Sequence, residues 1–249
     1  MPVWLEAGVW GLVGGLALVV GAAVAWFVRV PPRVVATIMA FGAGVLVSAL
    51  AFDLVDEAER SGGLVATVCG FLAGAVLYVG ANVALARRGA RHRKRSGDQQ
   101  PSEQDQAGSG AAIAIGSLLD GIPESVVLGL SLLSGEGVGV AVLAAVVISN
   151  VPEGLAGASG MQRSGRSARY VFGLWGGIAV ASGLAASAGA LLLEGASPAT
   201  VAVITAIAAG GILAMLADTM IPEAFERTHL LTGLVTTLGF LTAFTISRV

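Results

Sequence analysis

The sequence has few charged residues and almost no sulfur-based or imidazole ligands. Only 12% of its 249 residues are charged and 55% are hydrophobic, whereas soluble globular proteins carry roughly 25% charged residues. So little charge cannot cover a surface in contact with water. The single Cys69 excludes a disulfide framework and a cysteine metal site. A net charge of -2 gives no sign of a nucleic-acid partner, so the expected partner is the lipid bilayer.

Long apolar stretches divided by short polar connections predict an all-α integral membrane protein with about eight transmembrane helices. We expect residues 1–249 to form a single transmembrane domain. Each stretch supplies the roughly 20 residues that a helix needs to cross the hydrocarbon core. The predicted stretches are 5–28, 34–55, 64–86, 110–134, 138–160, 170–193, 199–221 and 229–247. Spaced glycines such as Gly70 and Gly74 would let helix backbones approach closely in lipid.

The first apolar stretch is predicted to be a retained helix. It contains Ala23-Val24-Ala25, which resembles a signal-peptidase site. Residues 1–7, however, carry Glu6 and no Lys or Arg, whereas a signal peptide begins with positive charge. A cleaved leader is the alternative.

Lys and Arg residues gather in alternate connections between the stretches. Only Arg60 and Arg248 fall on the other side. Cytoplasmic loops carry the excess of positive charge, so the pattern predicts a multi-pass protein of the cell (plasma or inner) membrane with both termini outside the cytoplasm. The residues on the predicted cytoplasmic side are Arg29, Arg33, the cluster from Arg87 to Arg95, Arg163, Arg166, Arg169 and Arg227.

One long connection, residues 87–109, is predicted to be a disordered cytoplasmic linker. It is basic at first and then rich in Ser, Gln, Asp and Glu. Such a composition cannot bury enough apolar surface to fold. Its basic half could face anionic lipid, and a regulatory role is the alternative.

The second and seventh stretches show an ungapped similarity that indicates internal repeats. Their matching pairs lie in stretches predicted to run in opposite directions, as in inverted-repeat transporters. We therefore expect a 3+2+3 arrangement, with helices 1–3 and 6–8 as inverted repeats around helices 4 and 5. The matches are Ala43-Gly44 with Ala209-Gly210, Leu50-Ala51 with Leu216-Ala217, and Glu57-Ala58 with Glu223-Ala224.

The fourth and fifth stretches carry carboxylates in the middle of apolar sequence, at Asp120, Glu124 and Glu153. A charged side chain at the bilayer centre costs ~2.5–3.5 kcal/mol on insertion scales, so such residues indicate function. We expect no Lys or Arg at their depth. The missing positive charge would then be a bound cation or protons.

The spacing of the polar residues favours a cation. Asp120 and Glu124 are four residues apart, and Ser149, Asn150 and Glu153 are three to four apart, so each set shares one helix face. These five residues form the predicted metal site. In addition, Pro123 and Pro152 deprive the carbonyls of Leu119 and Ile148 of their helical donors, which frees two more oxygens.

Further acids lie towards the ends of two other stretches. Asp53 is near the outer end of the second stretch, and Asp218 and Glu223 are near the inner end of the seventh. We predict that they line the transport pathway. The alternative is that they are solvated charges at helix ends.

The two proline-containing segments and the polar connection behind the third stretch resemble the ZIP family of metal transporters over nearly the whole chain. In that family, helices 4 and 5 carry His-Asn-x-Pro-Glu-Gly and helix 7 often ends in Asp/Glu-x-x-Pro-Glu, which Asp218-Thr219-Met220-Ile221-Pro222-Glu223 matches. The resemblance implies metal-binding positions at Glu124, Asn150 and Glu153. Asp120 and Ser149 replace the two usual histidines, and Gly121 replaces an asparagine.

The resemblance implies transport of divalent metal, with zinc first and manganese or iron close behind. A nearly all-oxygen site suits harder ions such as Mn²⁺ better than Zn²⁺, although zinc also binds carboxylates. Uptake towards the cytoplasm is the expected direction. The metal would be substrate, with no resident cofactor, and a homodimer is compatible with the sequence.

Two other functions compete with metal transport. A proton-coupled carrier of an organic solute would use the carboxylates as a relay, but we expect no buried cation to bind an anionic solute. An intramembrane metal-dependent enzyme would use them as acid and base. Because Ser125 and Ser149 have no His or Lys at membrane depth in the sequence, we expect no enzyme.

Overall fold

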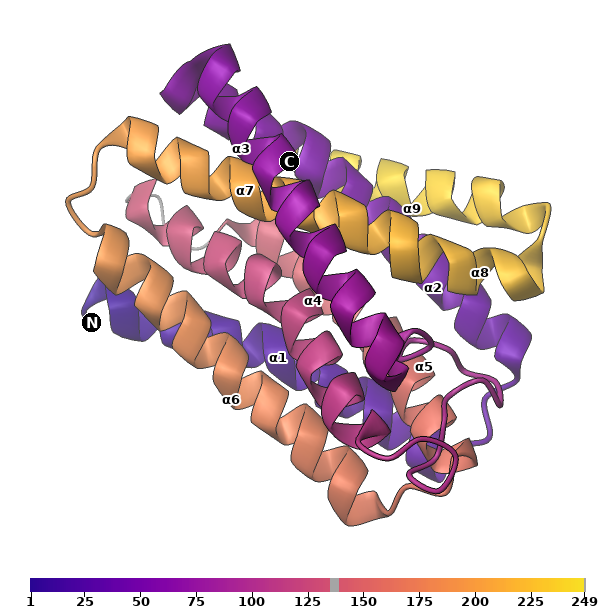
Figure 1. The fold of residues 1–249 in the computed structure, drawn as a ribbon. Coiled ribbons are helices and arrows are strands. Elements are labelled where there is room, and N and C mark those ends of the chain that lie inside the picture. Colours follow the sequence, from indigo (N-terminus) through magenta and orange to yellow (C-terminus); the bar gives the residue numbers. More distant parts are fainter. Residues whose placement is uncertain (135–138, 249) are drawn as a thin grey trace.

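Every element of regular structure in the described part of the chain is a helix. The computed structural model describes residues 1–134 and 139–248 (Figure 1). Its elements are α1 (Val3–Phe27), α2 (Pro32–Ala49), the π-helical η1 (Leu50–Val55), α3 (Asp56–Leu85), the π-helical η2 (Ala86–Ala90), α4 (Ser109–Ser131), the 3₁₀ turn η3 (Leu132–Ser134), α5 (Val140–Arg163), α6 (Ala168–Leu193), α7 (Pro198–Met215), the π-helical η4 (Leu216–Met220), α8 (Ile221–Thr228) and α9 (Leu231–Ile246).

Each predicted apolar stretch falls on helix in the structure except at its ends, where residues 28, 139, 229, 230 and 247 lie just beyond the helices and residue 138 lies outside the described residues. Local sequence explains where several helices begin. Pro32 and Pro198 stand in the first turns of α2 and α7, where the missing N–H costs nothing. Ser167 caps α6, because its hydroxyl oxygen accepts from the backbone N–H of Tyr170 at 3.3 Å.

Six helical stretches are long and apolar enough to cross a membrane, which indicates a multi-pass membrane protein. One of the six is a stretch of 59 residues, 32–90, that joins α2, η1, α3 and η2. At Gly63, φ is 79° and ψ is 164°, so the helical path breaks there. The C-terminal α9 is also apolar but has only 16 residues.

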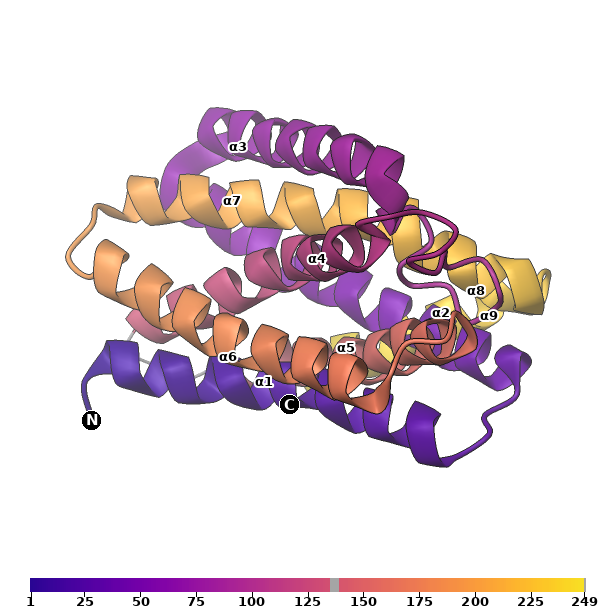
Figure 2. The ribbon, with the colours of Figure 1, turned by 60° about the horizontal axis from the view of Figure 1, so that its bottom comes forward.

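The helices form an elongated bundle in which α4 and α5 lie among the others. Figure 2 shows α3 beside α7 on one side and α1 beside α6 on the other, with α4 between these pairs. On the remaining side, α2 packs against α9 and α5. The elements that carry the three mid-helix carboxylates are therefore enclosed by protein, which is where irregular or polar groups are tolerated at membrane depth.

Glycines make the closest approaches between helices. A Cβ at any of four glycines would collide with a backbone carbonyl of the neighbouring helix, so no larger residue fits without moving a helix. The pairs are Gly44 with Thr236, Gly239 with Phe41, Gly210 with Phe71, and Gly74 with Ile207.

Replacing Gly74 by Ala should destabilise the protein by about 1–3 kcal/mol, the usual effect of overpacking. Gly80→Ala is the matched control, because it lies on the same helix and has no atom within 4 Å of an added Cβ. Both substitutions raise helix propensity equally. Unfolding in detergent would measure the difference, and equal stability of the two variants would contradict the close α3–α7 contact.

The basic connections lie at one end of the bundle. Figures 1 and 2 show the connections α1–α2, α3–α4, α5–α6 and α8–α9 at the same end, and the N-terminus and the α6–α7 connection at the opposite end. We call the first of these the basic end. It also holds the loop that joins η2 to α4, residues 91–108.

Candidate functional site

Helices α4 and α5 bury three carboxylates in the bundle. The exposed fractions of Asp120, Glu124 and Glu153 are 1%, 2% and 3%. Each helix contains an internal proline beside its glutamate, Pro123 and Pro152. Because a charge buried without a partner is costly, the partners of these three groups decide what the site can do.

Asp120 is held by an arginine that comes from the loop at the basic end. The Arg93 guanidinium donates from Nε to Oδ2 at 2.8 Å and from Nη2 to Oδ1 at 2.7 Å, a bidentate pair. The Tyr78 hydroxyl on α3 donates to Oδ1 at 2.6 Å. Arg93 is itself 1% exposed, so this pair is shielded from water.

Lys94 joins α4 to α5. Its Nζ lies 2.7 Å from Oε2 of Glu153 and 3.4 Å from Oδ2 of Asp120. Burial alone would lower the pKa of the Lys94 ammonium, but the carboxylates of Asp120 and Glu153 outweigh burial and raise that pKa. The two carboxylates therefore favour the charged form of Lys94.

The polar network continues from Arg93 to the surface of the basic end. Arg93 Nη1 donates to Oδ1 of Asn82 at 2.8 Å, and Nδ2 of Asn82 donates to Oδ2 of the exposed Asp218 at 3.1 Å. Asn82 and Asp218 line an open depression together with Arg87 and Arg91. A continuous line of polar contacts thus runs from solvent to the buried carboxylates.

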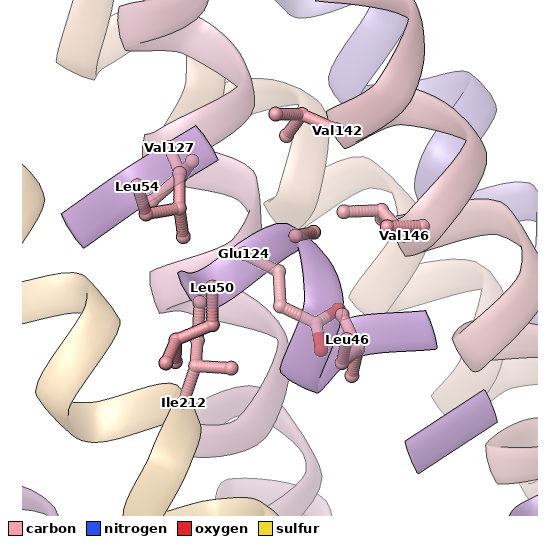
Figure 3. A pocket seen from close by; sticks show the side chains of 10 residues that line it. Leu46, Leu50, Leu54, Glu124, Val127, Val142, Val146 and Ile212 are labelled. Atoms are coloured by element: carbon pink, nitrogen blue, oxygen red, sulfur yellow. The ribbon is translucent and has the colours of Figure 1, made fainter. Parts of the chain in front are cut away.

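Glu124 lies on the other side of this network, and neither of its carboxyl oxygens has a hydrogen-bond partner among the residues that the structure describes. It projects among aliphatic side chains of α2, η1, α5 and α7, as Figure 3 shows. The cavity there offers about 10 Å³ to the centre of a water molecule, which is about what one water needs. The cavity lining includes Leu46, Leu50, Val146 and Ile212.

The other two predicted ligands bond to the backbone. The Ser149 hydroxyl donates to the carbonyl of Val146 at 3.0 Å, and Nδ2 of Asn150 donates to the carbonyl of Gly14 on α1 at 2.9 Å. Both side chains are buried. The Asn150 bond fixes α5 against α1, so it has a structural use in this arrangement.

The predicted pathway acids have different environments. Asp53 is half-buried in η1 and Asp218 is exposed in η4. Glu223, in contrast, is 2% exposed. Its Oε1 accepts from the backbone N–H of Ser96 at 3.0 Å and from the Ser96 hydroxyl at 2.7 Å, and Arg95 Nη1 lies 3.3 Å from Oε2.

The loop of residues 91–108 is attached to the helices at several further points. The Gln100 amide donates to the carbonyls of Arg93 at 2.9 Å, Arg95 at 3.1 Å and Gly157 at 3.2 Å. The Glu103 carboxylate accepts from the backbone N–H of Gly110 at 2.8 Å. The N–H groups of Gly110 and Gly108, with the Arg166 guanidinium, lower the pKa of the Glu103 carboxyl. Buried polar contacts thus attach residues 93–100 to the helices in this structure.

The structure bears on two sequence expectations about the site, one on basic residues near the carboxylates and one on the five predicted ligands. The expectation that no Lys or Arg reaches the carboxylates is wrong, because Arg93 and Lys94 pair with them. Of the five predicted ligands, Asp120 and Glu153 both contact Lys94, Ser149 and Asn150 bond to backbone carbonyls, and Glu124 faces the aliphatic cavity. Among residues 1–134 and 139–248, no three His, Cys, Asp or Glu side chains are grouped closely enough to hold a metal ion.

Sequence reasoning missed Arg93, Lys94, Tyr78 and Asn82. A signal for the last two was present, since Tyr78 and Asn82 are polar residues one helical turn apart in an otherwise apolar stretch. Arg93 and Lys94 belong to a run of basic residues that looks alike throughout, so nothing in it distinguishes the two that enter the bundle.

No protein-family model matches this chain, and a comparison with curated proteins finds no match either.

Proposed function

We propose that this protein is a carrier of divalent metal cations across the membrane, and not an enzyme. The observation that carries the proposal is the position of Lys94, whose single ammonium contacts Asp120 on α4 and Glu153 on α5. The two carboxylates are thus close enough to share one positive centre. Glu124, one helical turn from Asp120, adds a third carboxylate whose oxygens are unpartnered.

A ZIP-like architecture of eight crossings in a 3+2+3 arrangement fits this proposal. The break at Gly63 divides the 59-residue stretch into two crossings, and α9 would supply the eighth. The packing of the helices supports pseudo-symmetry between the two repeats. If α2 is exchanged with α7, and α3 with α9, the two close glycine contacts between α2 and α9 take the place of the two between α7 and α3. Contacts of Gly44 and Gly239 between α2 and α9 correspond to those of Gly210 and Gly74 between α7 and α3.

We infer that the basic end faces the cytoplasm of the cell and that both termini lie outside. The support is the gathering of basic connections at that end, in accord with the excess of Lys and Arg in cytoplasmic loops. With this orientation, the network from Asp218 through Asn82 to Asp120 would lie on the cytoplasmic side of the carboxylates. An ion released inwards would pass through it.

Zinc is the first candidate substrate on the ZIP resemblance, and manganese or iron follows on ligand chemistry. The proposed ligands are Asp120, Glu124, Ser149, Asn150 and Glu153, with Asp53, Asp218 and Glu223 along the pathway. Carboxylate, hydroxyl and amide oxygens suit hard ions. An ion would have to displace Lys94 and draw Ser149 and Asn150 from their backbone partners.

The buried cations also bear on the alternative of an organic-solute carrier. Arg93 and Lys94 could bind an anionic solute only if they were free. Both are taken up by Asp120 and Glu153, so neither is free to bind an anion in this arrangement.

Uptake into proteoliposomes of Zn²⁺, Mn²⁺, Fe²⁺, Cd²⁺ and Mg²⁺ would test the function. We expect saturable uptake of zinc, with manganese and iron transported at comparable rates and magnesium much more slowly, because Mg²⁺ dehydrates reluctantly. Protein-free liposomes are the control. If none of the five metals enters above that background, the chain is not a metal carrier.

A further inference from the structure

The side chains of Arg93 and Lys94 pair with the carboxylates of Asp120 and Glu153, as a bound cation would. The Lys94 ammonium is 3% exposed and lies between oxygens of α4 and α5. Of the basic residues in this connection, Arg93 and Lys94 are buried and the others are not. The only cationic groups that contact these carboxylates in the described residues therefore come from a loop and not from the helices that form the site.

The charges of the segment and of a divalent ion are equal. Arg93 and Lys94 together bring two positive charges to Asp120 and Glu153, as one divalent cation would. Both states cannot exist together, because the Lys94 ammonium fills the space between the two carboxylates, and a third and fourth positive charge in that interior would repel the first two. Binding of the ion and binding of the segment are thus mutually exclusive.

The segment is attached in a way that permits release. Ser96 and Arg95 contact Glu223, and Gln100 contacts backbone carbonyls, so the attachments are hydrogen bonds and ion pairs that water can replace once the segment moves. Residues 91–108 contain no helix of their own that would have to unfold. Departure of residues 93–100 would open the carboxylates towards the basic end.

We propose that Arg93-Lys94 is a tethered cationic plug, which competes with the transported divalent cation for Asp120 and Glu153 and closes the site at the basic end. This inference rests on the proposed function and deepens it. The plug holds the empty site neutral and sealed. Metal that enters from the other end displaces it and so opens its own exit.

The first test compares Lys94→Gln with the control Arg88→Gln in Zn²⁺ and Mn²⁺ uptake. Arg88 is in the same connection between α3 and α4 but is exposed and does not line the depression at Asp218, so the control removes an equal charge from the same connection. The apparent dissociation constant is the intrinsic one divided by the fraction of open protein, so a plug that is closed about nine times in ten raises it about tenfold. We expect Lys94→Gln to lower the half-saturating metal concentration about tenfold and Arg88→Gln to leave it unchanged.

The second test uses the unsubstituted protein and does not depend on the variant folding normally. Hydrogen exchange is measured on a peptide that covers residues 92–100, where the amide of Ser96 donates to Glu223. Zn²⁺ or Mn²⁺ at saturation should accelerate exchange of this peptide about tenfold and leave residues 64–85 of α3 unchanged. Lys94→Gln should show the fast exchange without metal.

The outcomes separate the two proposals. Metal uptake together with unchanged exchange of residues 92–100, or an equal response of Lys94→Gln and Arg88→Gln, would overturn the plug and leave the carrier standing. If no metal in the panel is taken up by the unsubstituted protein, the carrier fails and the plug fails with it.

Discussion

Glu153→Gln is expected to lower metal uptake at least about 100-fold, to the level of empty liposomes. The amide keeps the size of the side chain and removes the charge that a divalent cation needs. Loss of an outer-shell partner already costs 10–100-fold in metal affinity or activity, and loss of a charged ligand should cost more. Lys94 would also lose its nearer partner, which lies at 2.7 Å.

Glu194→Gln is the matched control for this variant. Glu194 is an exposed acid between α6 and α7, so its loss changes net charge equally and leaves the interior intact. Both variants should elute as single species in detergent and unfold within about 1–2 kcal/mol of the unsubstituted protein. Normal uptake by a folded Glu153→Gln protein would remove Glu153 from the site.

The sequence predicted where the helices lie, because a membrane helix can be recognised from its length and its hydropathy. Each apolar stretch needs no partner to be recognised, since every backbone group bonds within its own segment. Local irregularities were not predictable in this way. The stretches 34–55 and 199–221 both end in π-helical segments, η1 and η4, which hold Asp53 and Asp218. Such segments depend on packing more than on composition.

The buried carboxylates were also recognisable, since an acid in the middle of an apolar stretch stands out. Their partners were not. The linker was predicted to be disordered because it lacks apolar residues, and that criterion counts hydrophobic burial only. In the structure, Arg93 and Lys94 are held by ion pairs, which require buried carboxylates on other helices. No local pattern carries that information.

The pair Asp120 and Arg93 should show the largest effect on stability. Removing one member of a buried ion pair typically costs about 3–5 kcal/mol, because the other charge stays buried and unpaired. We expect Asp120→Asn to cost about that amount, since Arg93 would keep neutral partners, Tyr78, Asn82 and the carbonyl of Ala90. Arg93→Gln should cost less, because Lys94 and Tyr78 still contact Asp120.

The double variant Asp120→Asn with Arg93→Gln decides between pairing and simple loss of packing. If the two side chains stabilise each other, the double variant should recover about 1–3 kcal/mol relative to the sum of the single variants, the coupling usual for residues in contact. The free energies of unfolding would be measured in detergent with the same denaturant for all four proteins. Additive losses would mean that Arg93 and Asp120 are not paired in the membrane-embedded protein. In that event Lys94 would be the loop's remaining charged contact with α4.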